Sequence, residues 1–234
     1  MSISLSPRLF SCSSFVRTGD RVADIGCDHG YLGIYLLKEG IAASVIASDI
    51  NEGPLQSALK NAERYGVRDR MSFYLSDGVR SIPRDFDVMV CAGMGADTMI
   101  SILEAAPWLR NDGYRLILQC QSKTPMLRQY LDRNGWQITK ETVLRDGRFL
   151  YTVMEVVYLP DHPRLSPWEY YFPPALLIDP LPETREYYQQ VLTRLRRAVN
   201  GQGENADSET VNTLQALEFM ATRPDTLWLK EEIK

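Results

Sequence analysis

The sequence is poor in the residues that hold metal ions or cross-link chains. It has two histidines in 234 residues, and its four cysteines, Cys12, Cys27, Cys91 and Cys120, are widely spaced, with no C-x-x-C pair. These counts indicate neither a zinc site nor a disulfide framework. We therefore expect no metal, and cysteines that are reduced and mostly buried.

Long apolar runs are absent as well. No stretch approaches the ~18 residues of a membrane span, and residues 1–10 show neither the basic nor the apolar region of a secretory signal. The chain is 24% charged and 44% hydrophobic, which is typical of a globular protein with one full-sized core. We expect a cytoplasmic protein with no membrane partner.

The chain also lacks an excess of positive charge. It has 26 basic against 30 acidic residues, with 18 of each in residues 1–160 and 8 against 12 in residues 161–234. Phosphate binding needs a local excess of Lys and Arg, so bulk charge alone disfavours a nucleic-acid partner.

What the sequence does contain is an alternation of short apolar runs and amphipathic segments. The apolar runs predict strands at residues 21–25, 44–49, 71–75, 86–91 and 114–119. Apolar residues at i, i+3 and i+4 predict helices at residues 31–38, 54–65, 96–105 and 124–134. This βαβ rhythm indicates an α/β fold with a doubly wound, mostly parallel sheet.

An antiparallel hairpin is expected to close that sheet. Residues 137–145 and 148–158 flank Asp146-Gly147, a dipeptide favoured in tight hairpin turns. Seven of the 13 prolines then fall in residues 160–182, which we interpret as a connector.

Two amphipathic runs follow the connector. One ends before Asn200-Gly201 and the other spans about residues 208–222, which predicts two antiparallel helices joined by an exposed turn at residues 201–203. The expected organisation is a first domain over 1–159, the connector over 160–182 and a small helical domain over 183–234.

The most informative motif is VADIGCDHGYL at residues 22–32, where the first predicted strand turns into a helix. Ligands bind at this position in open α/β sheets. A dinucleotide fingerprint needs glycine where Asp28 stands, and no P-loop Gly-Lys-[Ser/Thr] follows. Two carboxylates, Asp24 and Asp28, with Gly26 and Gly30 suit a compact cation such as S-adenosylmethionine; the alternative is a tight turn with a capping Asp.

Carboxylates also follow the next two predicted strands. Asp49 stands where an acidic residue accepts hydrogen bonds from a ribose diol. Asp77-Gly78 stands where a carboxylate can accept from the exocyclic amine of adenine. Either Asp alone could instead cap a helix or a turn, but carboxylates at three successive strand ends favour a ligand site.

The fourth predicted strand leads into CAGMGAD at residues 91–97. Glycines on both sides of Met94 would let the backbone approach a flat ligand or a target base, and a glycine-rich helix start is the alternative. No Asn/Asp-Pro-Pro-aromatic tetrapeptide is present. That arrangement cradles an exocyclic amine for methylation, so chemistry at N6 of adenine is disfavoured.

Together these residues resemble the bacterial tRNA (adenine(22)-N1)-methyltransferases over about residues 4–158. The similar segments are LSPRL (5–9), DIGCDHGYL (24–32), IASDINEGPLQSA (46–58), SDG (76–78), CAGMG (91–95), LILQ (116–119) and LRQYLDRNGW (127–136). The resemblance implies a Rossmann-like class I methyltransferase domain, S-adenosylmethionine as donor, tRNA as partner and a C-terminal helical coiled-coil domain. The chain differs from the family patterns DHAYLP and AGMGG at Gly30, Gly33 and Ala96.

A methyltransferase acting on N1 must stabilise the positive charge that methylation leaves on adenine. Asp28 is our candidate, with His29 as the alternative proton acceptor, although Asp28 could equally contact the ammonium of the cofactor. Tyr31 is the candidate to hold the flipped base, Arg8 to grip a phosphate and Gly95 to border the base. The expected cofactor contacts are Asp24, Gly26, Cys27, Asp49, Ile50, Asp77, Gly78, Ala92, Gly93 and Met94.

Carboxylates used at the site alter the charge balance. Without Asp24, Asp28, Asp49 and Asp77, the acidic count of residues 1–160 falls from 18 to 14 against 18 basic. We expect a monomer that binds tRNA with modest, salt-sensitive affinity. The candidate backbone contacts are Arg8, Arg128, Arg133, Arg145, Arg148, Arg194, Arg196 and Arg197.

Three other functions are compatible with parts of this pattern. A methyltransferase of a small molecule or protein would keep the donor site without binding tRNA. A nicotinamide-dependent oxidoreductase is disfavoured by Asp28. A non-catalytic tRNA-binding adaptor would result if the Cβ of Ala96 blocked the base pocket.

Overall fold

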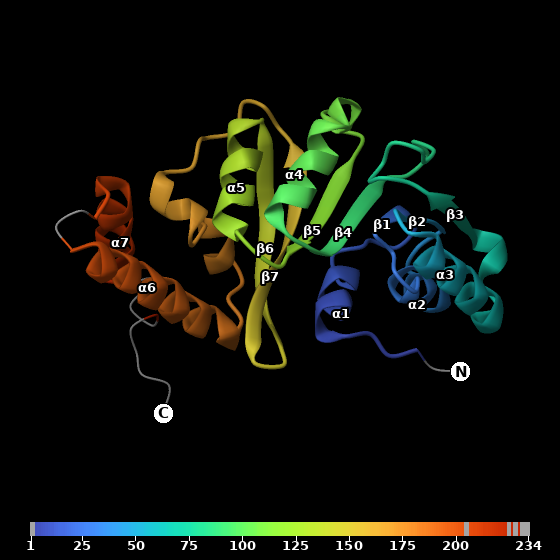
Figure 1. Cartoon of the computed structure of the whole chain (residues 1–234), viewed down its shortest axis with the longest axis horizontal. Coiled ribbons are helices and arrows are strands. Elements are labelled where there is room, and N and C mark those ends of the chain that lie inside the picture. The colour runs from blue at the N-terminus through green and yellow to red at the C-terminus, as the bar shows by residue number, and fades with distance from the viewer. Residues whose placement is uncertain (1–2, 204–205, 224–225, 227–228, 230–234) are drawn as a thin grey trace.

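A single sheet of seven strands runs through the computed structural model, which describes residues 3–203, 206–223, 226 and 229 (Figure 1). Its order is β3-β2-β1-β4-β5-β7-β6. The strands are β1 (Arg21–Ile25), β2 (Ser44–Asp49), β3 (Met71–Leu75), β4 (Val88–Met94), β5 (Arg115–Cys120), β6 (Trp136–Asp146) and β7 (Phe149–Tyr158). Strands β1 to β5 are parallel, and β7 lies antiparallel between β5 and β6. The prediction of a mostly parallel sheet closed by an antiparallel hairpin is confirmed.

Helices cover both faces of the sheet, which explains why its strands are apolar on both sides. Helices α1 (Pro7–Ser13), α2 (Tyr31–Lys38) and α3 (Glu52–Tyr65) pack on one face, and α4 (Ala96–Glu104) and α5 (Thr124–Arg133) pack on the other. Along β4, Val88 and Val90 enter the first core while Met89 and Cys91 enter the second. Short 3₁₀ turns at Arg68–Arg70 and Pro107–Leu109 precede β3 and β5.

Strand β4 differs from its predicted range because it begins later and continues to Met94. The pairing with β5 shifts between Ala92 and Met94, and Gly93 between them has φ +80°. A left-handed residue of this kind suits a β-bulge, where the strand bends and exposes backbone. The periodicity of the sequence ended the strand at Cys91 because the bulge breaks the run of buried residues.

Helix α1 was not predicted. Ser6 caps it, since the Ser6 hydroxyl accepts a hydrogen bond from the Leu9 amide at 3.4 Å, and Pro7 occupies the first turn. Ser followed by Pro is a recognised start signal for a helix. The helix places Cys12 and Phe15 in the first core, so the N-terminal segment belongs to the same layer as α2 and α3.

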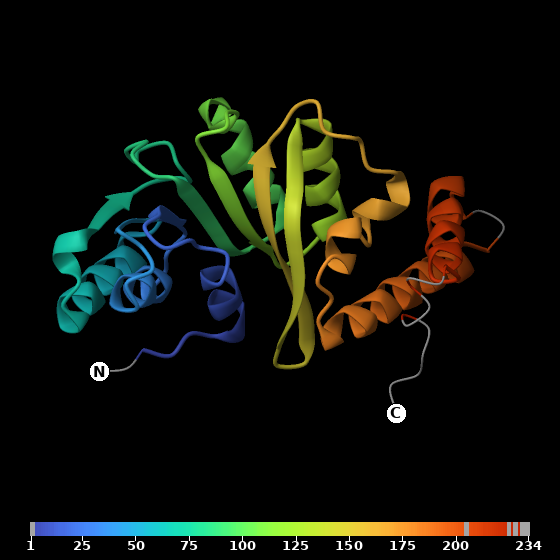
Figure 2. The ribbon, with the colours of Figure 1, turned by 180° about the vertical axis from the view of Figure 1, so that it is seen from behind.

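The C-terminal segment lies beyond β6, at the opposite end of the sheet from β3 (Figures 1 and 2). It comprises 3₁₀ turns at Pro167–Tyr170 and Pro174–Leu177, then α6 (Pro182–Gln202) and α7 (Ser208–Met220). A third core forms there around Phe172, Tyr188 and Leu217, and Val143 of β6 is part of it. The connector and α6 thus pack against the β6 edge of the sheet, and α7 packs on α6 and on the turn at Pro167–Tyr170.

The predicted turn at residues 201–203 is wrong in its position. Helix α6 continues through Asn200-Gly201 and ends at Gln202, with Gly203 as its C-cap. Glycine at residue 201 lowers helix propensity by only about 1 kcal/mol, which the packing of the helix outweighs.

The coiled-coil packing expected for the two helices is not found. Tyr188 and Arg196 lie about 12 Å apart along α6 at 1.5 Å per residue. Nevertheless Tyr188 bonds the carbonyl of Leu217 and Arg196 pairs with the adjacent Glu218. Helices paired along their length would bring these positions to different turns of the partner, whereas α7 crosses α6 steeply (Figures 1 and 2).

None of the described helices combines the length and the apolar character needed to cross a membrane.

Candidate active site

The sheet order reverses between β1 and β4, and the loop after β1 lies at this switch point. The end of β2 holds that loop in place. The amides of Gly26 and Cys27 donate to the carbonyl of Ser48 at 2.8 and 2.9 Å. The amide of Asp28 donates to Oδ2 of Asp49 at 3.2 Å. The motif at residues 22–32 is therefore a rigid loop at the position where open α/β sheets bind ligands.

A cavity of about 380 Å³ opens between this loop, α1 and the end of β4. Nine of the predicted site residues line it: Arg8, Asp24, Gly26, Cys27, Asp28, His29, Tyr31, Ala92 and Gly93. Its size falls within the range of small-molecule sites. Ser6, Leu9, Leu32 and Gln119 complete the lining and were not predicted.

Asp24 is a buried carboxylate in the wall of this cavity. The residue is 4% exposed, and its Oδ2 has no hydrogen-bond partner within the described ranges. Burial and then the charge of Asp49 raise the pKa of Asp24 to about 7. A cationic group in the cavity would satisfy the free oxygen and favour the ionised carboxylate.

Asp49 itself is held by two backbone groups. Its Oδ1 accepts from the Asn51 amide at 2.9 Å, and its Oδ2 accepts from the Asp28 amide. Each carboxylate oxygen can accept a second hydrogen bond, so acceptor capacity remains for a hydroxyl of a ligand. Asp49 therefore shapes the loop at residue 28, and its predicted contact with a ribose diol stays a prediction.

Asp28 has left-handed backbone geometry, with φ 50°, which is uncommon for a residue other than glycine. Its side chain is exposed at the rim, where His29 Nε2 lies 3.6 Å from Asp28 Oδ1. The ring of Tyr31 lies 6.0 Å from that of His29 and is part of the same rim. The two candidate proton acceptors and the candidate base-holding ring are thus neighbours.

A buried glutamine supports the other wall of the cavity. Gln119 is fully buried at the end of β5, and its Oε1 accepts from the Gly93 amide at 3.0 Å. This bond fixes the bulge that presents Ala92 and Gly93 to the cavity. A polar side chain at the end of an otherwise apolar strand was the available sequence signal for Gln119.

Other predicted residues lie near the cavity without lining it. Met94 packs its methyl group against Gly26, where a Cβ would leave no room for it, and Gly95 faces the Ser122 hydroxyl. Ile50 is exposed. Gly78 packs against Ile102 of α4, and a Cβ there would lie 2.9 Å from that side chain.

Asp77 points elsewhere in this structure. Its carboxylate pairs with Arg80, and both residues line a separate cavity with Asp97. The contact of Asp77 with an adenine amine stays a prediction, and it would require this exposed side chain to turn from Arg80. Ala96, the first residue of α4, is fully buried in the second core. Its Cβ does not narrow the candidate site.

Arg8 connects α1 to the tip of the hairpin. Its Nε lies 2.6 Å from Oδ2 of Asp146, and its guanidinium lies over the ring of Tyr151, 5.5 Å from the centroid. Asp146 therefore positions Arg8 at the mouth of the cavity. A role of Arg8 at a phosphate stays a prediction.

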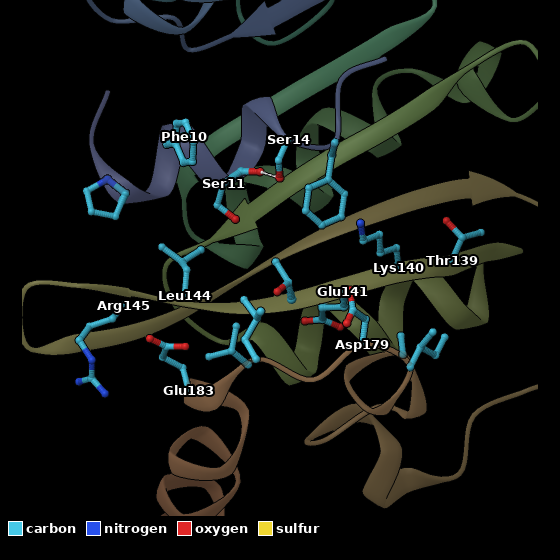
Figure 3. Close-up of a pocket in the computed structure, with 17 residues that line it drawn as sticks. Phe10, Ser11, Ser14, Thr139, Lys140, Glu141, Leu144, Arg145, Asp179 and Glu183 are labelled. Atoms are coloured by element: carbon cyan, nitrogen blue, oxygen red, sulfur yellow. Dashed lines mark hydrogen bonds between the residues drawn. The ribbon is translucent and has the colours of Figure 1, made fainter. Parts of the chain in front are cut away.

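A larger cavity of about 720 Å³ lies elsewhere, between α1, β6 and the start of α6 (Figure 3). Phe10, Ser11 and Ser14 enter it from α1, and Lys140 and Leu144 enter it from β6. It contains none of the predicted site residues. Size therefore does not identify the site, and the convergence of carboxylates and glycines at the switch point does.

Comparisons with known proteins find methyltransferases. A family model for a methyltransferase domain matches residues 5–154. The tRNA (adenine(22)-N(1))-methyltransferase of Bacillus subtilis is 31% identical over 153 residues, which are 65% of this chain and 64% of that protein. A candidate tRNA methyltransferase of Mycoplasma genitalium, MG248, is 33% identical over 58% of this chain and 61% of its own length. The matched segment thus spans less than two thirds of these curated relatives.

A solved structure extends the similarity to the full length. Sp1610 of Streptococcus pneumoniae, a candidate tRNA (m1A22) methyltransferase, is 31% identical with a TM-score of 0.82, over 92% of this chain and 99% of that one. The chain belongs to the tRNA (adenine(22)-N1)-methyltransferase family. Sp1610 has also been solved in complex with S-adenosyl-L-methionine.

The residues at the cavity fit the cofactor of this methyltransferase family. The free oxygen of buried Asp24 suits an ammonium group, Asp49 keeps acceptor capacity, and the Gly26 and Gly93 backbones lie open to the cavity. Within the described part of the chain, no three potential metal ligands cluster. The cysteines are buried, and burial raises the pKa of the Cys27 and Cys91 thiols, so neither is an activated nucleophile.

Proposed function

We propose that this protein transfers a methyl group from S-adenosylmethionine to N1 of adenine 22 in tRNA. The observation that carries the proposal is the pairing of two environments at one cavity. A buried carboxylate, Asp24, lies in its wall, and an exposed acidic and aromatic rim, Asp28, His29 and Tyr31, lies at its mouth. Membership in the family supports the choice of donor and target.

The donor end of the cavity would be formed by Asp24, Asp49 and the glycine loops. When bound, S-adenosylmethionine supplies an activated methyl group that the N1 lone pair takes by in-line displacement. Asp24 would bind the ammonium, and Asp49 would accept from ribose hydroxyls. The bond from Gln119 to Gly93 would hold the far wall rigid, so that the methyl carbon and N1 stay aligned.

The rim would handle the target base. N1 carries an in-plane lone pair and needs no base before attack, but methylation leaves positive charge on the ring. The Asp28 carboxylate would stabilise that charge, with His29 3.6 Å away to share the proton that leaves N6. Tyr31 would hold the adenine outside its stack.

The proposed substrate places the protein in the cytoplasm, where tRNA is modified. The net charge of -4 does not oppose this proposal, since part of the acidic count lies at the site itself. The sulfonium and ammonium of the cofactor outweigh its carboxylate by one positive charge, which would offset one carboxylate of the site when it binds.

The decisive experiment is incubation with labelled S-adenosylmethionine and unmodified tRNA, followed by nuclease digestion and mass spectrometry. We expect 1-methyladenosine at position 22, and none on a tRNA in which that adenosine is replaced by guanosine. Transfer to a small molecule or a protein but to no tRNA would contradict the proposal. Calorimetry with a nicotinamide cofactor should show no binding.

Asp28→Asn tests the role of the rim carboxylate. Asparagine tolerates the left-handed backbone at this position, so the loop should keep its shape. We expect kcat to fall about 10²-fold or more while the Kd values for tRNA and for S-adenosylmethionine change little. A large loss of cofactor affinity with intact kcat would instead make Asp28 a ligand of the ammonium.

A further inference from the structure

Another cavity, of about 600 Å³, lies between the loop after β5, the start of β7 and α6. We call it the aromatic pocket. Its lining includes four aromatic side chains and two basic ones: Phe149, Tyr151, Tyr171, Tyr187, Lys123 and Arg194. None of these residues belongs to the site described above.

The aromatic pocket is next to the candidate active site. Cys120 at the end of β5 pairs with Thr152, so the first residues of β7 lie at the same edge of the sheet as the cavity. The Gln121 amide donates to the carbonyl of Met94 at 2.8 Å, which joins the pocket to the bulge of β4. Tyr151 lines the aromatic pocket, and the guanidinium of Arg8, which lines the active-site cavity, lies over the ring of Tyr151.

Two rings of the pocket project from one side of β7. Phe149 and Tyr151 are two residues apart on the strand and therefore share a face, with ring centroids 6.3 Å apart. Phe149 is 53% exposed, and the Arg148 guanidinium lies 4.9 Å from its ring centroid. Proteins that bind single-stranded nucleic acids stack the bases on aromatic side chains, and arginine guanidinium groups add to the binding. Phe149 and Arg148 have this arrangement.

The charges around the pocket are mixed. Arg194 is exposed and has no ion-pair partner among the residues described, while Lys123 is paired with Asp97 at 2.9 Å. Glu209 and Asp207 of the α7 start lie close enough to Tyr171 to raise its pKa, although burial is the larger cause. One free cation suits one phosphate, so ring stacking should carry most of the binding.

We propose that the aromatic pocket binds the nucleotide adjacent to the methylated adenosine, with its base stacked on Phe149 and its phosphate near Arg194. This inference rests on the proposed function, because a base must leave its stack before N1 can reach the methyl group. The neighbouring base then loses a stacking partner, and Phe149 replaces it. The pocket would thus hold the RNA open while the adenine occupies the rim at Asp28 and Tyr31.

Phe149→Ala is the direct test, with Phe219→Ala as its matched control. Phe219 is 66% exposed on α7 and does not line the pocket, so both variants remove an exposed ring and should fold. One base–aromatic stack corresponds to about 5- to 150-fold in affinity. We expect Phe149→Ala to lower kcat/KM for tRNA by that factor, mainly through KM, and Phe219→Ala to change it less than about twofold. The Kd for S-adenosylmethionine should not move in either variant.

A modified substrate makes the test specific for the neighbouring base. On tRNAs that carry an abasic site on either side of the target adenosine, one of the two should erase the difference between wild type and Phe149→Ala. The inference would be overturned if Phe149→Ala lowered kcat/KM by the same factor on intact tRNA and on both abasic tRNAs. It would also be overturned if Phe149→Ala did not lower kcat/KM on intact tRNA.

The proposed function can fail separately. If wild-type protein forms no 1-methyladenosine, that function fails, and the pocket is then tested by the Kd for tRNA. The pocket would still be supported if Phe149→Ala bound intact tRNA more weakly than wild type does, and if the two proteins bound one of the abasic tRNAs equally well. Equal Kd values for wild type and Phe149→Ala would overturn it.

Discussion

Arg128 of α5 and Glu141 of β6 form an ion pair that solvent does not reach, with Nη2 of the arginine 2.5 Å from Oε1 of the glutamate. The same guanidinium donates to the carbonyl oxygens of Tyr170 and Tyr171 at 2.8 and 3.2 Å and to the Tyr187 hydroxyl at 3.3 Å. Arg128 therefore ties the sheet to the connector and to α6. Its predicted contact with the tRNA backbone is wrong, because the side chain is fully buried.

Removing one member of this pair should be costly. Arg128→Ala leaves the Glu141 carboxylate buried without its partner, and we expect the free energy of unfolding to fall by about 3–5 kcal/mol. Urea denaturation measures it, with Lys60→Ala at an exposed position of α3 as a control expected within about 0.5 kcal/mol of wild type. A loss below about 1 kcal/mol for Arg128→Ala would mean that water or a rearranged group replaces the pair.

The pKa of Asp24 predicts how stability depends on pH. The folded value of about 7 lies above the ordinary 3.8, so the folded protein binds this proton more tightly than the unfolded chain. The resulting stabilisation is complete below about pH 4 and is lost as pH rises to about 7, by up to about 4 kcal/mol. Asp24→Asn should remove this fall between about pH 4 and 7. Parallel stability profiles of wild type and Asp24→Asn between pH 4 and 8 would contradict the assigned pKa.

Substitution of two glycines with positive φ can distinguish the cost of backbone strain from the cost of steric crowding. Gly30 and Gly40 have φ +71° and +66°, but a Cβ at Gly30 would lie 2.9 Å from Cβ of Ala58, whereas Gly40 faces open space. Gly40→Ala should cost about 1–2 kcal/mol for the left-handed backbone alone. Gly30→Ala should cost at least about 1 kcal/mol more, because α2 and α3 must move apart. Thermal melting of the two variants compares them, and equal losses would show that the helices yield without cost.

The surface arginines predict the salt dependence of tRNA binding. Of the eight candidates, Arg128 is buried, and Arg8, Arg145 and Arg196 pair with acidic side chains. The remaining four, Arg133, Arg148, Arg194 and Arg197, are exposed. At about 0.7 counterions per phosphate contact, log Kobs should fall with log[salt] with a slope of about -3. Arg194→Ala should make the slope shallower by about 0.7, and a slope of about -5 would require that the three paired surface arginines also bind phosphates.

The order of elements could be predicted from the sequence. The predicted ranges of β1, β2, β3 and α2 have the same bounds as in the structure. Strands β1 and β2 are buried on both faces and α2 along one stripe, which gives a clear sequence pattern. The carboxylates at strand ends could also be located, since parallel strands bring their carboxyl ends to one edge. For this reason the loop at residues 24–31 was correctly placed on the candidate cavity.

The contacts between distant residues depended on the tertiary structure. The fold places β6 beside α5, so that Arg128 contacts Glu141. It also places the hairpin tip beside α1, so that Arg8 contacts Asp146. No sequence motif marks either pair. The burial of Arg128 and the hydrogen bond from the Gly93 amide to Gln119 follow from such placements. The periodicity of a segment shows which of its faces is apolar. It does not show which charged side chain of another element will contact it. The sequence by itself therefore determined the layers of the fold and the position of the loop at residues 24–31, whereas the tertiary structure decided which side chains face the cavity and which stabilise the fold.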